Sequence, residues 1–216
     1  LKAIYAAPFH NEKSTGPADG MEKSYQEIMN ILTLLGREDL KANVYKGSTA
    51  YMPSETEPVI SEAAKDLAER AMRYTEEDPL YVIAIGAITN VSSALLLNPE
   101  IKNRMVLIWL GGNAIHWPHN REFNLFQDGA RIVFGCGVPL VQLPCMGVVS
   151  AFTTSGPELE YHLRGKNKLC DYLVDVTTKE ALECYGGSTW TRPIWDVTAV
   201  AWLLDGDFEE DCLIHS

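Results

Sequence analysis

The chain has 216 residues, of which 46% are hydrophobic, so it can bury a core and fold as a single domain. Its 18 basic and 29 acidic residues give a net charge of -11, which opposes binding to nucleic acid and to anionic membranes. Five dispersed cysteines without CxxC spacing, the lack of an apolar run near about 20 residues and the lack of an export-type opening predict a cytoplasmic protein without a membrane segment.

Strand-length apolar runs alternate with helical patterns along the chain. In chain order, the predicted strands cover residues 1–7, 42–47, 80–86, 105–112 and 139–144. The predicted helices cover residues 21–36, 61–74, 89–97, 128–135, 156–165 and 196–206. Gly36 is placed to end the first helix and Ser61 to cap the second, while 14–20 and 51–58 have the composition of loops. The strand runs are too uniformly apolar for a sheet wet on one face, so the order predicts an α/β fold with a mainly parallel sheet flanked by helices.

Polar side chains gather after the fourth predicted strand, where ligands of open α/β sheets collect. Glu122 and Asn124 lie either side of Phe123, so in an extended segment the carboxylate and the amide share one face. Spacing alone favours a hydrogen-bonded loop brace ahead of the helix that Asp128 begins. Asp196 opens the last predicted helix, where by itself it is typical of an N-cap.

Read together, four segments resemble the inosine-uridine nucleoside hydrolases. They are AIGAITNVSSALLLNP (84–99), WLGG (109–112), EFNLFQDGARIVFGCGVPL (122–140) and WDVTAVAWLL (195–204), in the family's order. The resemblance implies a Rossmann-like nucleoside hydrolase fold over residues 1–216 and a calcium-dependent enzyme that hydrolyses the N-glycosidic bond of ribonucleosides. It also implies a homodimer or homotetramer.

The same resemblance assigns roles to individual residues. Glu122 and Asn124 would hold the ribose hydroxyls and serve catalysis, Asp196 would be a calcium ligand, and Ile85 would offer its backbone carbonyl to the metal. The chemistry agrees, because an oxocarbenium-like transition state needs fixed oxygen acceptors near the sugar ring. Calcium takes six to eight hard oxygen ligands and can hold a nucleophilic water.

The chain also departs from the family pattern. The aspartate-rich D-x-D-x-x-x-D-D loop is absent, so the chain is expected to lack the N-terminal strand and loop and the C-terminal end, and as given to bind calcium poorly and turn over little. Asn11 is the candidate for the family asparagine that reaches a ribose hydroxyl after the first strand, and His116, Trp117 and Asn120 are the candidates for a second substrate-binding position. Trp195 stands where many members have the histidine that protonates the leaving base. Its indole cannot be that acid but can stack on a base.

Two other hypotheses stay open at this point. One is a non-catalytic nucleoside-binding or scaffold protein that kept the fold without the metal loop. The other is an unrelated α/β hydrolase with Cys145 as nucleophile, although a buried structural thiol is the more common role of such a cysteine.

Overall fold

The computed structural model describes residues 1–114, 116, 127–185 and 190–204. The strands are β1 (Ile4–Tyr5), β2 (Val44–Tyr45), β3 (Leu80–Ala84), β4 (Met105–Leu110), β5 (Leu140–Leu143), β6 (Thr153–Ser155) and β7 (Thr191–Pro193). The α-helices are α1 (Pro17–Leu34), α2 (Glu62–Arg70), α3 (Thr89–Leu97), α4 (Gln127–Gly135), α5 (Gly156–Leu163), α6 (Lys168–Tyr185) and α7 (Asp196–Leu203). Short 3₁₀ helices cover Glu38–Asn43, Ala71–Arg73, Pro99–Asn103 and Val149–Ala151.

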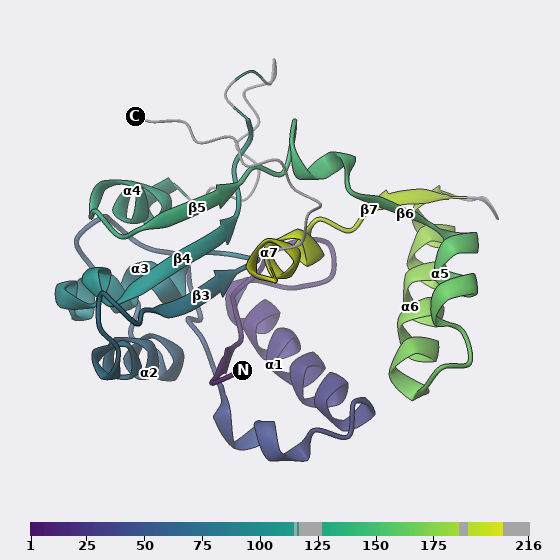
Figure 1. Ribbon diagram of the computed structural model, residues 1–216, viewed down its shortest axis with the longest axis horizontal. Coiled ribbons are helices and arrows are strands. Elements are labelled where there is room, and N and C mark those ends of the chain that lie inside the picture. Colours follow the sequence, from purple (N-terminus) through teal and green to yellow (C-terminus); the bar gives the residue numbers. More distant parts are fainter. Residues whose placement is uncertain (115, 117–126, 186–189, 205–216) are drawn as a thin grey trace.

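The five predicted strands all form and all pair in parallel, which confirms the predicted α/β class. Strand β1 pairs with β2, and β4 lies between β3 and β5 with Leu107 opposite both Val82 and Leu140. Helices α2, α3 and α4 lie together beside this second sheet, and α7 lies apart from them near the arrowhead end of β3 (Figure 1). The strands are shorter than the apolar runs because each run also includes residues of the loop that follows.

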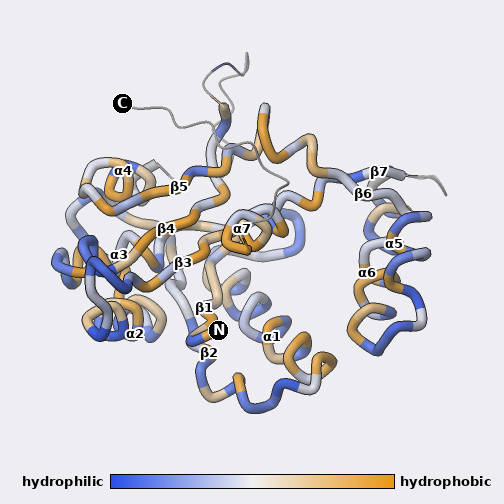
Figure 2. Tube along the Cα trace, viewed as in Figure 1, coloured by the Kyte–Doolittle hydropathy of each residue, from blue (hydrophilic) through white to orange (hydrophobic). Residues whose placement is uncertain are grey.

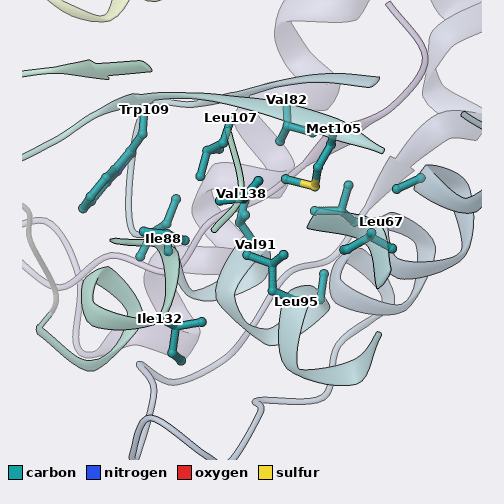
Figure 3. Close-up of a cluster of buried hydrophobic side chains, with 14 of the residues drawn as sticks. Leu67, Val82, Ile88, Val91, Leu95, Met105, Leu107, Trp109, Ile132 and Val138 are labelled. Atoms are coloured by element: carbon teal, nitrogen blue, oxygen red, sulfur yellow. The ribbon is translucent and has the colours of Figure 1, made fainter. Parts of the chain in front are cut away.

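Both faces of the β3–β4–β5 sheet are buried, as the uniformly apolar strands predict. Along β4, Met105, Leu107 and Trp109 belong to a core shared with α2, α3 and α4 (Figure 3). The alternate residues Ile108 and Leu110 belong to a second core. That core includes Ala199 of α7, with Trp202 packed against it, so the period-two alternation of the strand serves two helical layers. In Figure 2 these strands and α7 are mostly hydrophobic along their length.

Helix boundaries follow from local capping chemistry. The predicted cap Ser61 accepts a hydrogen bond from the backbone N–H of Ala64 at 3.1 Å, at the start of α2. The first helix starts earlier than predicted, at Pro17, because proline at a first helical position loses no intrahelical hydrogen bond. Part of the predicted loop 14–20 is therefore helical. Gly36 lies just after the end of α1 with φ 71°, a conformation that favours glycine.

One α-helix, α6, and two strands, β6 and β7, were not predicted from the sequence. The two strands form an antiparallel pair in which Thr154 lies opposite Arg192. Helices α5 and α6 form a hairpin next to this pair, at the right of Figure 1. Within the described ranges, no helix is both long enough and apolar enough to cross a membrane.

Candidate functional site

The carboxyl ends of β3, β4 and β5 lie at one edge of the sheet because the three strands are parallel. Helix α7 packs against β3 and β4 and begins at this edge. Buried Cys145, which follows β5, lies close enough to the Asp196 carboxylate for that negative charge to act on its thiol. The start of α7 therefore lies near the carboxyl end of β5, at the edge where parallel α/β sheets bind ligands.

A buried asparagine fixes the loops at this edge. The side-chain amide of Asn90 donates to the carbonyl of Ala6 at 2.8 Å, and its oxygen accepts from the backbone N–H and hydroxyl of Ser48 at 2.8 and 2.9 Å. The chain passes so close here that a Cβ on Gly47 would lie 1.8 Å from the Ala6 oxygen. Asn90, in the first turn of α3, thus joins this helix to the segments that follow β1 and β2, a role that its place in the sequence did not predict.

Asp196 is the first residue of α7 and not its N-cap, which corrects the interpretation from sequence. The N-cap is Trp195, and no side chain caps the helix. The described residues place no hydrogen-bond donor on the Asp196 carboxylate. Desolvation raises the pKa of that carboxyl group above its ordinary value, although the residue still has an exposed surface, and the nearby Arg192 charge partly opposes the rise. A carboxylate in this state is suited to a cation or a polar ligand.

Cys145 does not have the properties of a nucleophile. Its side chain is fully buried, and burial together with the charge of Asp196 raises the pKa of the thiol to about 12. Because only the thiolate is reactive, this environment keeps the group inert near neutral pH. The structure therefore supports the structural role of Cys145 and disfavours the cysteine-hydrolase hypothesis.

A cavity of about 520 Å³ lies between the α5–α6 hairpin and the start of α7. That volume is within the range of about 300–1,000 Å³ typical of small-molecule sites. Its wall includes Trp195 and Asp196 together with Arg192 of β7 and Glu180 of α6. Apolar side chains make up much of the remaining wall: Leu159, Leu163, Leu173, Pro193, Ile194 and Val197. Glu158 and His162 of α5 also line it, so the cavity combines an apolar surface with three carboxylates, an imidazole and a guanidinium.

Glu180 is held by two cations from distant parts of the chain. It accepts from the ammonium of Lys13, in the loop after β1, at 2.7 Å, and from the Nη1 group of Arg192 at 3.3 Å. The Lys13 hydrogen bond, and to a smaller extent Arg192, hold the pKa of Glu180 below its ordinary value against partial burial. Neither Arg192 nor Glu180 was predicted as a site residue from the sequence. Arg192 lies in no recognisable motif, and helix α6, which carries Glu180, was not predicted.

The remaining predicted site residues are placed as follows. Ile85 directly follows β3 and is half exposed, and His116 is exposed in the loop after β4. Asn11 is exposed in a turn, where its side-chain oxygen accepts from the Lys13 N–H at 2.9 Å. Trp117, Asn120, Glu122 and Asn124 lie outside the described residues, so their assignments stay predictions.

The described residues do not by themselves fit a calcium ion. Asp196 and the carbonyl of Ile85 are hard oxygen donors of the right kind, but calcium takes six to eight. No group of three or more acidic, histidine or cysteine side chains suited to a metal occurs in the part of the chain that the structure describes.

Comparison with known proteins decides the family. A sequence model described as inosine-uridine preferring nucleoside hydrolase matches residues 5–215, nearly the whole chain. The chain belongs to this nucleoside hydrolase family.

Relatives and a solved structure agree with the family assignment. The pyrimidine-specific ribonucleoside hydrolases RihA of Citrobacter koseri and of an Escherichia coli O1:K1 strain are 26% and 29% identical, over 85% of this chain and 66% and 67% of theirs. A purine-preferring ribonucleoside hydrolase from Gardnerella vaginalis superposes with a TM-score of 0.62 at 22% identity, over 85% of this chain and 69% of that one. This likeness confirms the nucleoside hydrolase fold. The chain spans about two thirds of the length of these relatives.

Proposed function

We propose that the protein hydrolyses the N-glycosidic bond of ribonucleosides and releases ribose and the free base. Family membership supports this proposal, and one structural observation carries it. The Asp196 carboxylate borders a cavity of nucleoside size without a protein hydrogen-bond donor among the described residues. Because this carboxylate does not cap α7, it does not give the helix the stability of an N-cap. It remains available to bind a ligand in the cavity.

The residues divide the work in the proposed reaction. Glu122 and Asn124 would hold the ribose hydroxyls, Asp196 and the Ile85 carbonyl would be among the ligands of a calcium ion supplied with its water, and Trp195 would provide an apolar surface for the base. The reaction forms a bond from water oxygen to the anomeric carbon and breaks the bond to the base nitrogen, whose electron pair leaves with the base. Calcium and its water remain the prediction of the family resemblance, together with the homodimer or homotetramer and the cytoplasmic location.

A ribose-release assay on the full-length natural protein tests the proposal. The panel contains uridine, cytidine, inosine and adenosine, because the printed names of the relatives include both a pyrimidine-specific and a purine-preferring hydrolase. We expect ribose release that a calcium chelator abolishes and that added calcium restores. Release that a chelator leaves unchanged would contradict the metal, and no release from any nucleoside would contradict the activity.

Two variants locate the site in the same assay. Asp196→Ala is expected to lower calcium affinity and turnover together, while Glu122→Gln is expected to weaken ribose binding and the chemical step. Asp39→Ala is the matched control, because Asp39 pairs with Arg37 at an exposed position and not with any site residue. Normal turnover in both site variants would mean that the site is assigned wrongly.

A non-catalytic nucleoside-binding protein is the second candidate. It is favoured by the shortage of metal donors among the described residues, where no group of three suited to a metal occurs. The same preparation distinguishes the two functions, because a binding protein gives a calorimetric signal with nucleosides but releases no ribose from them.

A further inference from the structure

Departure of the base is the step of the proposed reaction that still lacks a residue. As the C1′–N bond breaks, the electron pair moves onto the base and spreads to its ring nitrogens and carbonyl oxygens. A hydrogen-bond donor beside the base lowers the barrier, most of all if the donor is positively charged. Trp195, at the start of α7, offers only a neutral indole N–H.

Arg192 is the permanently charged group that lines the same cavity as Trp195 and Asp196. Its charge also acts on the Asp196 carboxylate, so the two groups lie near each other in the cavity wall. Its side chain is about one third exposed, with only Nη1 bonded to an acceptor among the described residues. The other N–H groups of its guanidinium have no acceptor there and can bond a ligand.

We propose that Arg192 contacts the departing base and stabilises the negative charge that develops on it. This inference rests on the proposed function and names a residue for its leaving-group step. The guanidinium donates hydrogen bonds without giving up a proton, because arginine stays charged at all physiological pH values. The water that attacks C1′ loses a proton to solvent, and the released base takes a proton from solvent, so atoms and charges balance.

Glu180 is the positioning residue for Arg192. Its carboxylate joins Arg192 to Lys13 of the β1 loop, at 3.3 and 2.7 Å, which holds the guanidinium against the cavity wall. Sharing Glu180 with Lys13 also leaves Arg192 only partly neutralised, which suits a group that must attract a developing anion.

Two substrates that differ only in leaving group test the proposal in the full-length protein. The base of uridine is a poor leaving group unless the enzyme stabilises its negative charge. In contrast, 4-nitrophenyl β-ribofuranoside releases a phenolate that is stable without a contact from the enzyme. We expect Arg192→Gln to lower kcat/KM for uridine about 10- to 100-fold and that for the nitrophenyl riboside less than about 3-fold. Arg192→Lys, which keeps the charge, should restore part of the uridine activity.

The controls separate this inference from the proposed function. Arg164→Gln removes an arginine from the α5–α6 hairpin that pairs with Glu160 and Asp175 outside the cavity lining, and it should leave both rates unchanged. If wild type releases ribose but Arg192→Gln slows both substrates equally, Arg192 has no role in leaving-group departure. A selective uridine defect in His162→Gln, but not in Arg192→Gln, would assign that step to His162 on the same cavity wall. If Arg192→Gln does not fold, Arg192→Met removes the charge in its place, and an unchanged ratio of the two rates in that variant overturns the proposal.

Inactivity of the wild-type protein on both substrates would instead overturn the proposed function itself. Glu180→Gln gives a separate readout of positioning. It should raise KM for uridine more than it lowers kcat, because the guanidinium is present but less well held.

Discussion

The β3–β4–β5 sheet and the α5–α6 hairpin are built in different ways. Five of the six β4 residues are buried, and apolar cores lie on both faces of the sheet. In contrast, α5 contains no buried residue, and Val174 and Ala181 are the buried residues of α6 within its described part. The hairpin is joined to the rest of the molecule largely by polar contacts, such as Lys13 to Glu180 and Tyr172 to Glu27.

This difference suits the site that lies where the two regions meet. Close packing holds the sheet edge and Asp196 in place, since a packed core has few alternative arrangements. Polar contacts between exposed groups contribute little to the free energy of unfolding. Residues in the hairpin wall of the cavity can therefore be substituted with little loss of stability. Substitutions in the sheet should therefore cost more stability than substitutions in the hairpin wall of the cavity.

The largest expected effect comes from the core of the sheet. Leu107→Ala removes a fully buried side chain from the centre of β4 and should lower the free energy of unfolding by about 2–5 kcal/mol. Leu182→Ala, at a half-exposed position of α6, should cost under about 1 kcal/mol. Denaturant unfolding measures both, and equal costs would break the comparison between the two regions.

A polar cluster beside β1 and β2 should give an intermediate effect. Asp66 of α2 accepts from Arg70 at 2.7 and 2.9 Å and from the hydroxyl of Tyr5, and its side chain is 16% exposed. Asp66→Ala leaves Arg70 and Tyr5 without this partner, and it should lower the free energy of unfolding by about 1–3 kcal/mol.

The matched change in the hairpin is Asp175→Ala, which removes one of the exposed partners of Arg164. It should leave the unfolding midpoint unchanged within error. A loss of stability as large as that of Asp66→Ala would show that the hairpin depends on its ion pairs more than its exposure implies.

The smallest effect concerns pH. The pKa of Glu180 is depressed in the folded protein, so its stabilising contribution is complete above the ordinary glutamate pKa. It is lost as the pH falls through the lower, folded value. We expect acid to loosen α6 before β4, seen as faster amide hydrogen exchange in α6 after correction for intrinsic rates. In Glu180→Gln this acid-dependent difference should disappear, and its persistence would assign it to other groups.

The polar residues show why much of the site was not predictable from the sequence. Asp196 was correctly placed at the start of a helix, but the sequence could not distinguish an N-cap from the first helical residue, because this depends on backbone geometry at Trp195. Arg192 and Glu180 meet only because β7 returns antiparallel to β6 beside the hairpin. Helix α6 was not predicted because only Val174 and Ala181 of its described apolar residues are buried, so its sequence has no clear amphipathic pattern.

By itself, the sequence determined the α/β class, the five parallel strands and the family. Uniformly apolar runs and ordered motifs are patterns of neighbouring residues, so they can be recognised without knowledge of the tertiary structure. Only the tertiary structure decided which side chains share a cavity. Asp196, Arg192 and Glu180 come together through the packing of α7 on the sheet and the pairing of β6 with β7. These contacts join segments that are distant in the sequence, so patterns of neighbouring residues do not predict them.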